Sequence, residues 1–133
     1  MVGLPYETHE SILATLEFAV ELDLDSTQYY AAQPLPGTPF FNQAKENGWL
    51  VPDYIEHFDG NYSTPLNYPW LSQKEIGTLT MKCKRTVEKA QLKRYMRNPR
   101  RMWRYIRGRG ISYAIRKAKT VMFSKDHVYV AGT

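Results

Sequence analysis

The chain has 133 residues, of which 43% are hydrophobic and 14% aromatic, which is typical of a folded domain and not of a disordered segment. No run of about 18 apolar residues occurs, so no transmembrane helix is expected, and the single cysteine, Cys83, excludes an internal disulfide. The net charge of +5 hides a division, because residues 1–81 carry eleven acidic and two basic side chains whereas residues 82–119 carry fifteen basic side chains and one acidic. We expect a cytoplasmic protein, with membrane association as an open alternative.

The first 48 residues predict the order strand, helix, strand, helix. Residues 1–4 are typical of a strand end, and Thr8 can cap a helix. The apolar stripe of that helix consists of Ile12, Leu16, Ala19 and Val20. Residues 26–33 predict a second strand, so the pattern is that of parallel βαβα units, which normally need strands on both sides. We therefore expect an α/β fold that forms part of a larger barrel.

A rigid hinge follows the second predicted strand. Pro34 and Pro36 remove backbone donors and stop the strand, and Gly37 permits a sharp turn. Thr38 can cap a helix whose first residue is Pro39. The hinge lies at the carboxyl end of a predicted strand, the edge where α/β proteins bind ligands.

The remaining sequence predicts a loop and a helical tail. Residues 49–71 are irregular, aromatic and rich in turns, which is typical of a functional or lid-like loop. Ser72-Gln73-Lys74-Glu75 forms a capping box for a helix that runs to about Arg97. The apolar face of this helix consists of Ile76, Leu79, Cys83, Val87 and Ala90. Asn98-Pro99 and Gly108-Arg109-Gly110 separate two further helices. We divide the chain into residues 1–48, 49–71 and 72–133.

Four short motifs carry a resemblance to a known family. They are Gly3-Leu4-Pro5-Tyr6-Glu7-Thr8, Leu22-Asp23-Leu24-Asp25, Pro34-Leu35-Pro36-Gly37-Thr38-Pro39 and Ala44-Lys45-Glu46-Asn47-Gly48. In this order they resemble the last part of the catalytic barrel of radical S-adenosylmethionine (SAM) enzymes, in particular the group that often carries a cobalamin-binding domain. The resemblance covers roughly residues 1–60. It implies the last two βα units of a partial TIM-like barrel followed by an α-helical tail.

The resemblance also implies a chemistry that this chain cannot perform alone. Enzymes of this family cleave SAM reductively at a four-iron cluster held by three cysteines, and they carry out radical C–H chemistry or methylation, in some relatives with cobalamin. This chain has one cysteine, and His9, His57 and His127 show no metal-ligand spacing. We therefore expect no catalytic residue and no metal ligand here. The chain is predicted to be inactive without the remainder of the barrel, its expected partner.

Six residues match positions near the adenosine of SAM in the family. They are Gly3, Leu4, Pro5, Glu7, Gln33 and Pro34. Glu7 can accept hydrogen bonds from a ligand hydroxyl or favour the positive end of the following helix, and both roles stay open. The family usually has glycine where this chain has Tyr6. Because tyrosine does not easily adopt a positive φ, we expect the turn to differ here.

The tail combines basic and aromatic side chains, which leaves three alternatives. It can form a solvated basic face that packs on the acidic part of the same chain. Residues 82–119 can also lie on an anionic membrane surface, where each basic side chain contributes about 1 kcal/mol, or bind nucleic acid through arginine and stacked rings. Met102 and Trp103, which lie beside arginines, favour the membrane over RNA. The alternative to the enzyme hypothesis is therefore a small basic binding protein.

Overall fold

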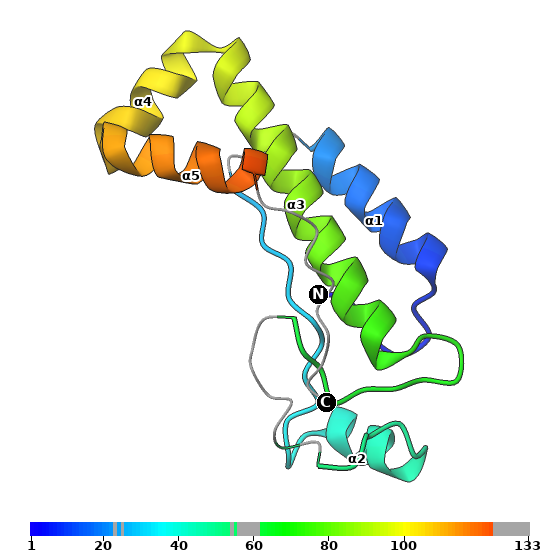
Figure 1. Ribbon diagram of the computed structural model, residues 1–133. Helices are drawn as coiled ribbons and strands as arrows, with labels where there is room; N and C mark the ends of the chain where they lie inside the picture. Colours follow the sequence, from blue (N-terminus) through cyan, green and yellow to red (C-terminus); the bar gives the residue numbers. More distant parts are fainter. Residues whose placement is uncertain (23, 25, 54, 56–61, 124–133) are drawn as a thin grey trace.

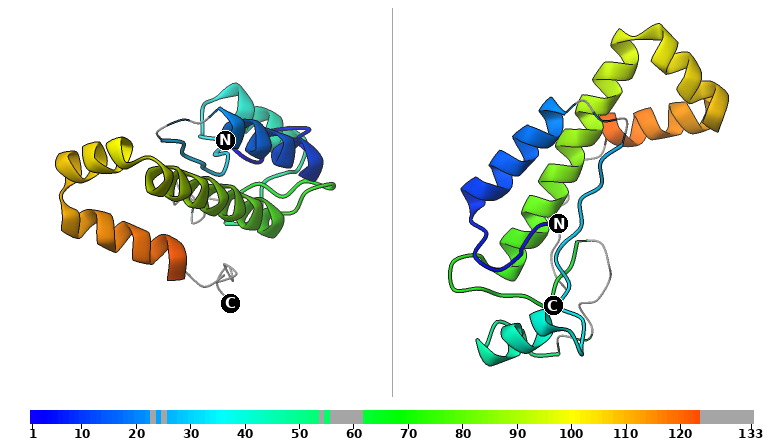
Figure 2. Two further views of the ribbon diagram at one scale, coloured as in Figure 1. Left: turned by 90° about the horizontal axis from the view of Figure 1, so that it is seen from above. Right: turned by 180° about the vertical axis from the view of Figure 1, so that it is seen from behind.

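The computed structural model describes residues 1–22, 24, 26–53, 55 and 62–123. In these residues the chain forms five helices, α1 (His9–Glu21), α2 (Pro39–Glu46), α3 (Gln73–Arg97), α4 (Pro99–Arg109) and α5 (Ile111–Phe123). The long helix α3 lies beside α1, while α4 and α5 fold back from one end of α3 and α2 lies toward the other end (Figure 1 and Figure 2).

The predicted α/β barrel portion is wrong, because the described residues contain no strand and no sheet. The segments expected to be strands are extended and meet at a single parallel bridge between Val2 and Ala31. The Val2 N–H donates to Tyr30 O at 2.9 Å, and the Ala32 N–H donates to Val2 O at 2.7 Å. Pairing stops there because the chain turns away at Gly3, where φ is 90°. A single bridge does not make a strand, so the architecture is helical.

The helix starts are those that the sequence predicts. The side chains of Thr8, Thr38 and Ser72 accept a backbone N–H from the third residue of the helix that each begins. Ser72 and Glu75 complete the predicted capping box. Asn98 ends α3 and also caps α4, so these two helices are joined without a loop.

The buried core lies between α1, α3 and the extended segments. It contains Val2, Ile12, Leu16, Tyr29, Ala31, Ala32, Ala44, Trp49, Leu66, Tyr68, Leu71, Ile76, Leu79, Cys83 and Val87. The predicted apolar stripes of α1 and α3 are therefore confirmed. Cys83 is completely buried, and burial raises the pKa of its thiol, as expected for a small core residue. The division at residues 48 and 71 stays a prediction.

The last two helices are only partly packed. On α5, Val121 is buried and Ala114 and Ala118 are half-buried, whereas Ile111, Ile115 and Met122 are exposed. In the part of the chain that the structure describes, no helix combines the length and apolar character needed to span a bilayer.

Candidate functional site

The first predicted site residues form a tight turn ahead of α1. The Glu7 carboxylate accepts the N–H of Gly3 at 2.7 Å and the N–H of Leu4 at 2.9 Å, both on Oε2. Pro5 lies half-buried within this turn. Glu7 therefore holds the turn closed, a role that neither alternative from the sequence included. A contact between Glu7 and a ligand stays a prediction.

The expectation that Tyr6 would give this turn a different conformation from that of a glycine is wrong. Its φ is 66°, so tyrosine occupies the left-handed region here. The strain of that conformation is offset by contacts, because the Tyr6 ring stacks on Trp70 at 5.9 Å and the two Glu7 hydrogen bonds fix the backbone on either side.

Gln33 and Pro34 follow the bridged part of the second extended segment. Pairing with the first segment ends at the Ala32 N–H, which donates to Val2 O. Pro34 is fully buried. The Gln33 amide donates from Nε2 to Ser63 O at 2.6 Å, whereas its Oε1 is buried with no hydrogen-bond partner among the described residues. The structure brings Gly3, Leu4, Pro5 and Glu7 together in one turn, whereas Gln33 is fixed on Ser63.

An aromatic cluster that the sequence did not predict covers the turn. Trp70 stacks between Tyr6 and Tyr68, and Trp49 packs against all three rings edge-on. The Tyr68 hydroxyl donates to Gly3 O at 2.9 Å, and the Trp70 Nε1 donates to Glu7 O at 3.2 Å. Burial raises the pKa of Tyr68, which keeps its hydroxyl a donor. The aromatic content of the predicted loop was the feature of the sequence that could have indicated this cluster. Residues 54 and 56–61 of that loop lie outside the described residues.

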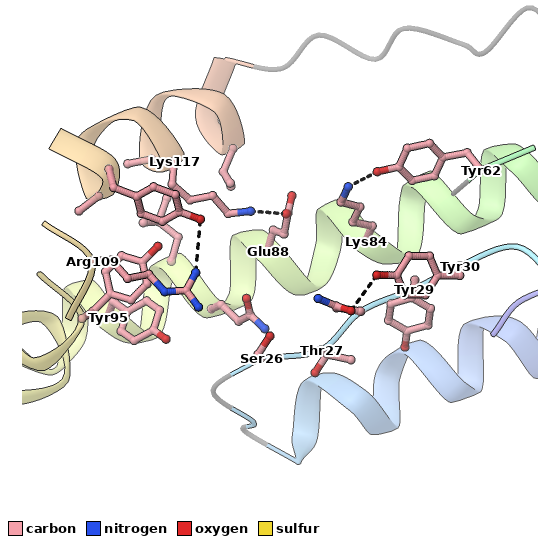
Figure 3. A pocket seen from close by; sticks show the side chains of 18 residues that line it. Ser26, Thr27, Tyr29, Tyr30, Tyr62, Lys84, Glu88, Tyr95, Arg109 and Lys117 are labelled. Atoms are coloured by element: carbon pink, nitrogen blue, oxygen red, sulfur yellow. Dashed lines mark hydrogen bonds and ion pairs between the residues drawn. The ribbon is translucent and has the colours of Figure 1, made fainter. Parts of the chain in front are cut away.

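A second site is a cavity of about 500 Å³ that is lined by residues 84–95 of α3. Residues 26–30 form one wall, α3 forms the floor, and α4 and α5 form the other wall (Figure 3). The lining includes six tyrosines: Tyr29, Tyr30, Tyr62, Tyr95, Tyr105 and Tyr113. As expected for adjacent residues of an extended segment, Tyr29 and Tyr30 differ, since the Tyr29 hydroxyl donates to Thr15 O of α1 and the Tyr30 hydroxyl donates to Gln28.

Charged side chains are held in place around this cavity. Lys117 of α5 pairs with Glu88 of α3 at 2.6 Å. Burial alone would lower the pKa of Lys117, but the hydrogen bond and charge of Glu88 raise it, so the lysine stays charged. The Arg109 guanidinium lies 6.0 Å from the Tyr105 ring and 5.6 Å from the Tyr113 ring. Lys84 donates to the Tyr62 hydroxyl (Figure 3).

The sequence indicated several residues of this cavity but did not predict that they lie together. Tyr95, Arg109, Tyr113 and Lys117 belong to the basic and aromatic pattern of the tail. The sequence left open whether that pattern packs on the same chain, lies on a membrane or binds nucleic acid, and the return of α5 along α3 turns part of it inward. The opposite wall, residues 26–30, is distant in sequence and carried no signal.

The residues present do not fit an iron–sulfur cluster. Such a cluster needs three thiolates, and the chain has one cysteine, which is buried in the core. No group of three or more His, Cys, Asp or Glu side chains in the described ranges could hold a metal ion. His9 is exposed at the start of α1, and His57 and His127 lie outside the described residues.

Comparison with known proteins gives one partial similarity. Over 51 residues, 38% of this chain, the sequence is 41% identical to an uncharacterized methyltransferase of Pyrococcus horikoshii. The matched part spans 11% of the length of that protein. No protein-family model matches the chain. No solved structure matches it either.

Proposed function

We propose that this chain is the carboxy-terminal portion of a radical SAM enzyme of the methyltransferase type. The observation that carries the proposal is the 41% identity over 51 residues to a protein named as a methyltransferase. The motifs that resemble radical SAM enzymes supply the finer assignment. In the intact enzyme the portion lines part of the SAM and substrate pocket through Gly3, Leu4, Pro5, Glu7, Gln33 and Pro34.

Gln33 supports this role through one buried acceptor. Gln33 Oε1 is buried and lacks a partner among the described residues, whereas its Nε2 is fixed on Ser63 O. A hydroxyl or amine of a ligand satisfies such an acceptor, and the fixed Nε2 keeps the carbonyl pointing in one direction. Glu7 keeps the amino-terminal turn closed. SAM, bound beside a four-iron cluster on other parts of the enzyme, supplies the radical or methyl group. Some relatives also use cobalamin.

Two experiments test this proposal. The chain alone, incubated with iron, sulfide and a reductant, is expected to gain no charge-transfer absorbance, because a lone buried thiol cannot hold a cluster. The DNA upstream of codon 1 is expected to encode a cysteine triplet, in frame or across a frameshift. Cluster incorporation by the chain alone contradicts the predicted inactivity, and unrelated upstream DNA contradicts the assignment as a portion of this enzyme.

A variant tests the role of Gln33 in the complex with the upstream polypeptide. Gln33→Leu removes the buried acceptor, and we expect the affinity for SAM or substrate to fall about tenfold. Gln43→Leu on α2 is the matched control, because it removes the same group away from the turn. Equal affinities of the two variants would show that Gln33 does not face the ligand.

A second candidate function is attachment to an anionic membrane surface. The observation that favours it is the exposed apolar stripe of α5, in which Ile111 is 62%, Ile115 is 52% and Met122 is 66% exposed. These residues are spaced to lie on one side of the helix, and residues 99–123 contain eight basic and no acidic side chains.

Vesicle binding separates this candidate from nucleic-acid binding. The chain is expected to sediment with phosphatidylserine vesicles and not with phosphatidylcholine vesicles, and less so at high salt. Ile115→Glu should abolish sedimentation, whereas Thr86→Glu, the same charge change at an exposed position of α3, should not. If the chain binds RNA but not vesicles, and Ile115→Glu leaves the RNA binding unchanged, the result favours nucleic-acid binding.

A further inference from the structure

Two residues that line the cavity between residues 26–30, α3 and α4–α5 each have one buried polar atom without a hydrogen-bond partner among the described residues. Thr27 Oγ1 and Gln91 Nε2 both belong to lining residues, are shielded from solvent, and have no hydrogen-bond partner within the described part of the chain. Gln91 belongs to α3, between the two walls, whereas the Thr27 hydroxyl points toward α1 (Figure 3). Buried polar groups are normally paired, so the unpaired amide of Gln91 beside the cavity favours a ligand with an acceptor for it.

The charges around the cavity favour an anion. Its lining contains three cations, Lys84, Arg109 and Lys117, and one carboxylate, Glu88, which is paired with Lys117. Arg109 is exposed, and its guanidinium lies over two tyrosine rings. These rings hold the guanidinium in place without neutralising its charge. A guanidinium in this setting matches a carboxylate or phosphate, with which it forms two parallel hydrogen bonds.

The tyrosines favour a planar ring. Tyr95 and Tyr105 stack at 4.7 Å, and Tyr105 lies 6.5 Å from Tyr113, so α3, α4 and α5 each contribute one ring to the same wall. Burial raises the pKa of Tyr105, so the phenol stays neutral and does not oppose an anion. Aromatic walls bind planar ligands by stacking or edge contacts, and about 500 Å³ is within the range of small-molecule sites.

We propose that this cavity binds a planar aromatic ligand that carries one carboxylate or phosphate. Arg109 at the mouth pairs with the anionic group, and Tyr105 and Tyr113 contact the ring. Gln91 donates to a polar atom of the ring. The site is separate from the amino-terminal turn and does not depend on SAM chemistry.

Flavin mononucleotide is a suitable probe, because it joins a planar ring to a phosphate and its fluorescence is quenched by stacked tyrosine. Titration of the probe with the whole chain is expected to give saturable quenching. Riboflavin, which has the same ring without the phosphate, should bind about tenfold more weakly. Displacement by 2-naphthyl phosphate and by 2-naphthoate distinguishes a phosphate from a carboxylate ligand, and inorganic phosphate alone should displace little.

Four variants assign the contacts. Arg109→Met should weaken binding of the phosphorylated probe about tenfold and leave riboflavin unchanged, while Arg107→Met, which removes an arginine of the same helix outside the lining, should leave both unchanged. Gln91→Leu should weaken both probes, and Gln91→Glu, which keeps the size and removes the donor, provides a second test if Gln91→Leu unfolds. Equal affinity for the two flavins, or equal effects of Arg109→Met and Arg107→Met, would overturn the proposal.

Discussion

Gly3 is the position at which a single methyl group tests the packing of the amino-terminal turn on α3. Its φ is 90°, and a Cβ built on it would lie 2.8 Å from Ile76 Cγ2 and 3.2 Å from Ile76 Cδ1. Ile76 is completely buried, so it has no free space into which it can move. Gly3→Ala therefore combines an unfavourable backbone conformation with overpacking.

The two terms can be estimated separately. A positive φ costs an alanine about 1–2 kcal/mol, and overpacking of a filled core costs about 1–3 kcal/mol. Gly3→Ala should therefore lower the free energy of unfolding by about 2–5 kcal/mol. Gly37→Ala is the matched control, because Gly37 has a φ of 86° with nothing within 4 Å of a Cβ. It should lose only the backbone term, about 1–2 kcal/mol.

Urea denaturation followed by tryptophan fluorescence measures both variants, and thermal melting should shift by about 4 °C for each kcal/mol. A double-mutant cycle with Ile76→Ala isolates the contact, because removal of the Ile76 side chain should make the effect of Gly3→Ala similar to that of Gly37→Ala. Equal losses for Gly3→Ala and Gly37→Ala in the presence of Ile76 would refute the proposed contact between the turn and α3.

Three further predictions follow from the caps and the core. Ser72→Ala should lower the free energy of unfolding by about 1 kcal/mol. It should also raise the pKa of Glu75, because hydrogen bonds from Ser72 hold that pKa below its usual value. A carboxyl NMR titration in which the Glu75 pKa does not move would contradict the capping box. Burial raises the pKa of Tyr68 in the folded state, so its contribution to stability is complete below the unfolded value of 10.0 and is lost as the pH rises through the folded value. Tyr68→Phe should therefore give a flatter stability profile above about pH 10, and parallel profiles for the two proteins would exclude this role. Cys83 is buried, so a disulfide reagent should modify it only at the rate at which the chain opens, and rapid modification under native conditions would place the thiol outside the core.

The helix boundaries could be predicted because they depend on neighbours in sequence. Thr8, Thr38, Ser72 and Asn98 cap helices through residues three positions away, and such contacts exist in any surroundings. The apolar stripes of α1 and α3 likewise follow from helical periodicity. The fold class could not be predicted this way. Residues 26–33 have the composition of a strand, but a strand also needs a partner along its length, and here the turn at Gly3 ends the pairing after Ala31.

Long-range contacts explain the other differences between prediction and structure. Tyr6 adopts a positive φ because Trp70 stacks on it, and the two residues are far apart in sequence. The cavity forms because α5 returns along α3 toward residues 26–30, which depends on the direction in which α4 leaves the end of α3. Of the six residues assigned from the resemblance, Gly3, Leu4, Pro5 and Glu7 share one turn, and Gln33 and Pro34 lie on the other bridged segment. Their contact with a ligand stays a prediction.

The corner at Asn98 makes the tail sensitive to chain length. Asn98 is both the C-cap of α3 and the N-cap of α4, so no loop residue separates the two helices. An inserted or deleted residue near this corner must therefore change one of the helices. One residue inserted into α3 ahead of this corner would rotate everything beyond it by about 100° around the α3 axis. Arg109 and Tyr113 would then face away from Thr27, although every helix kept its sequence. Insertions and deletions between Gln91 and Asn98 should therefore be poorly tolerated.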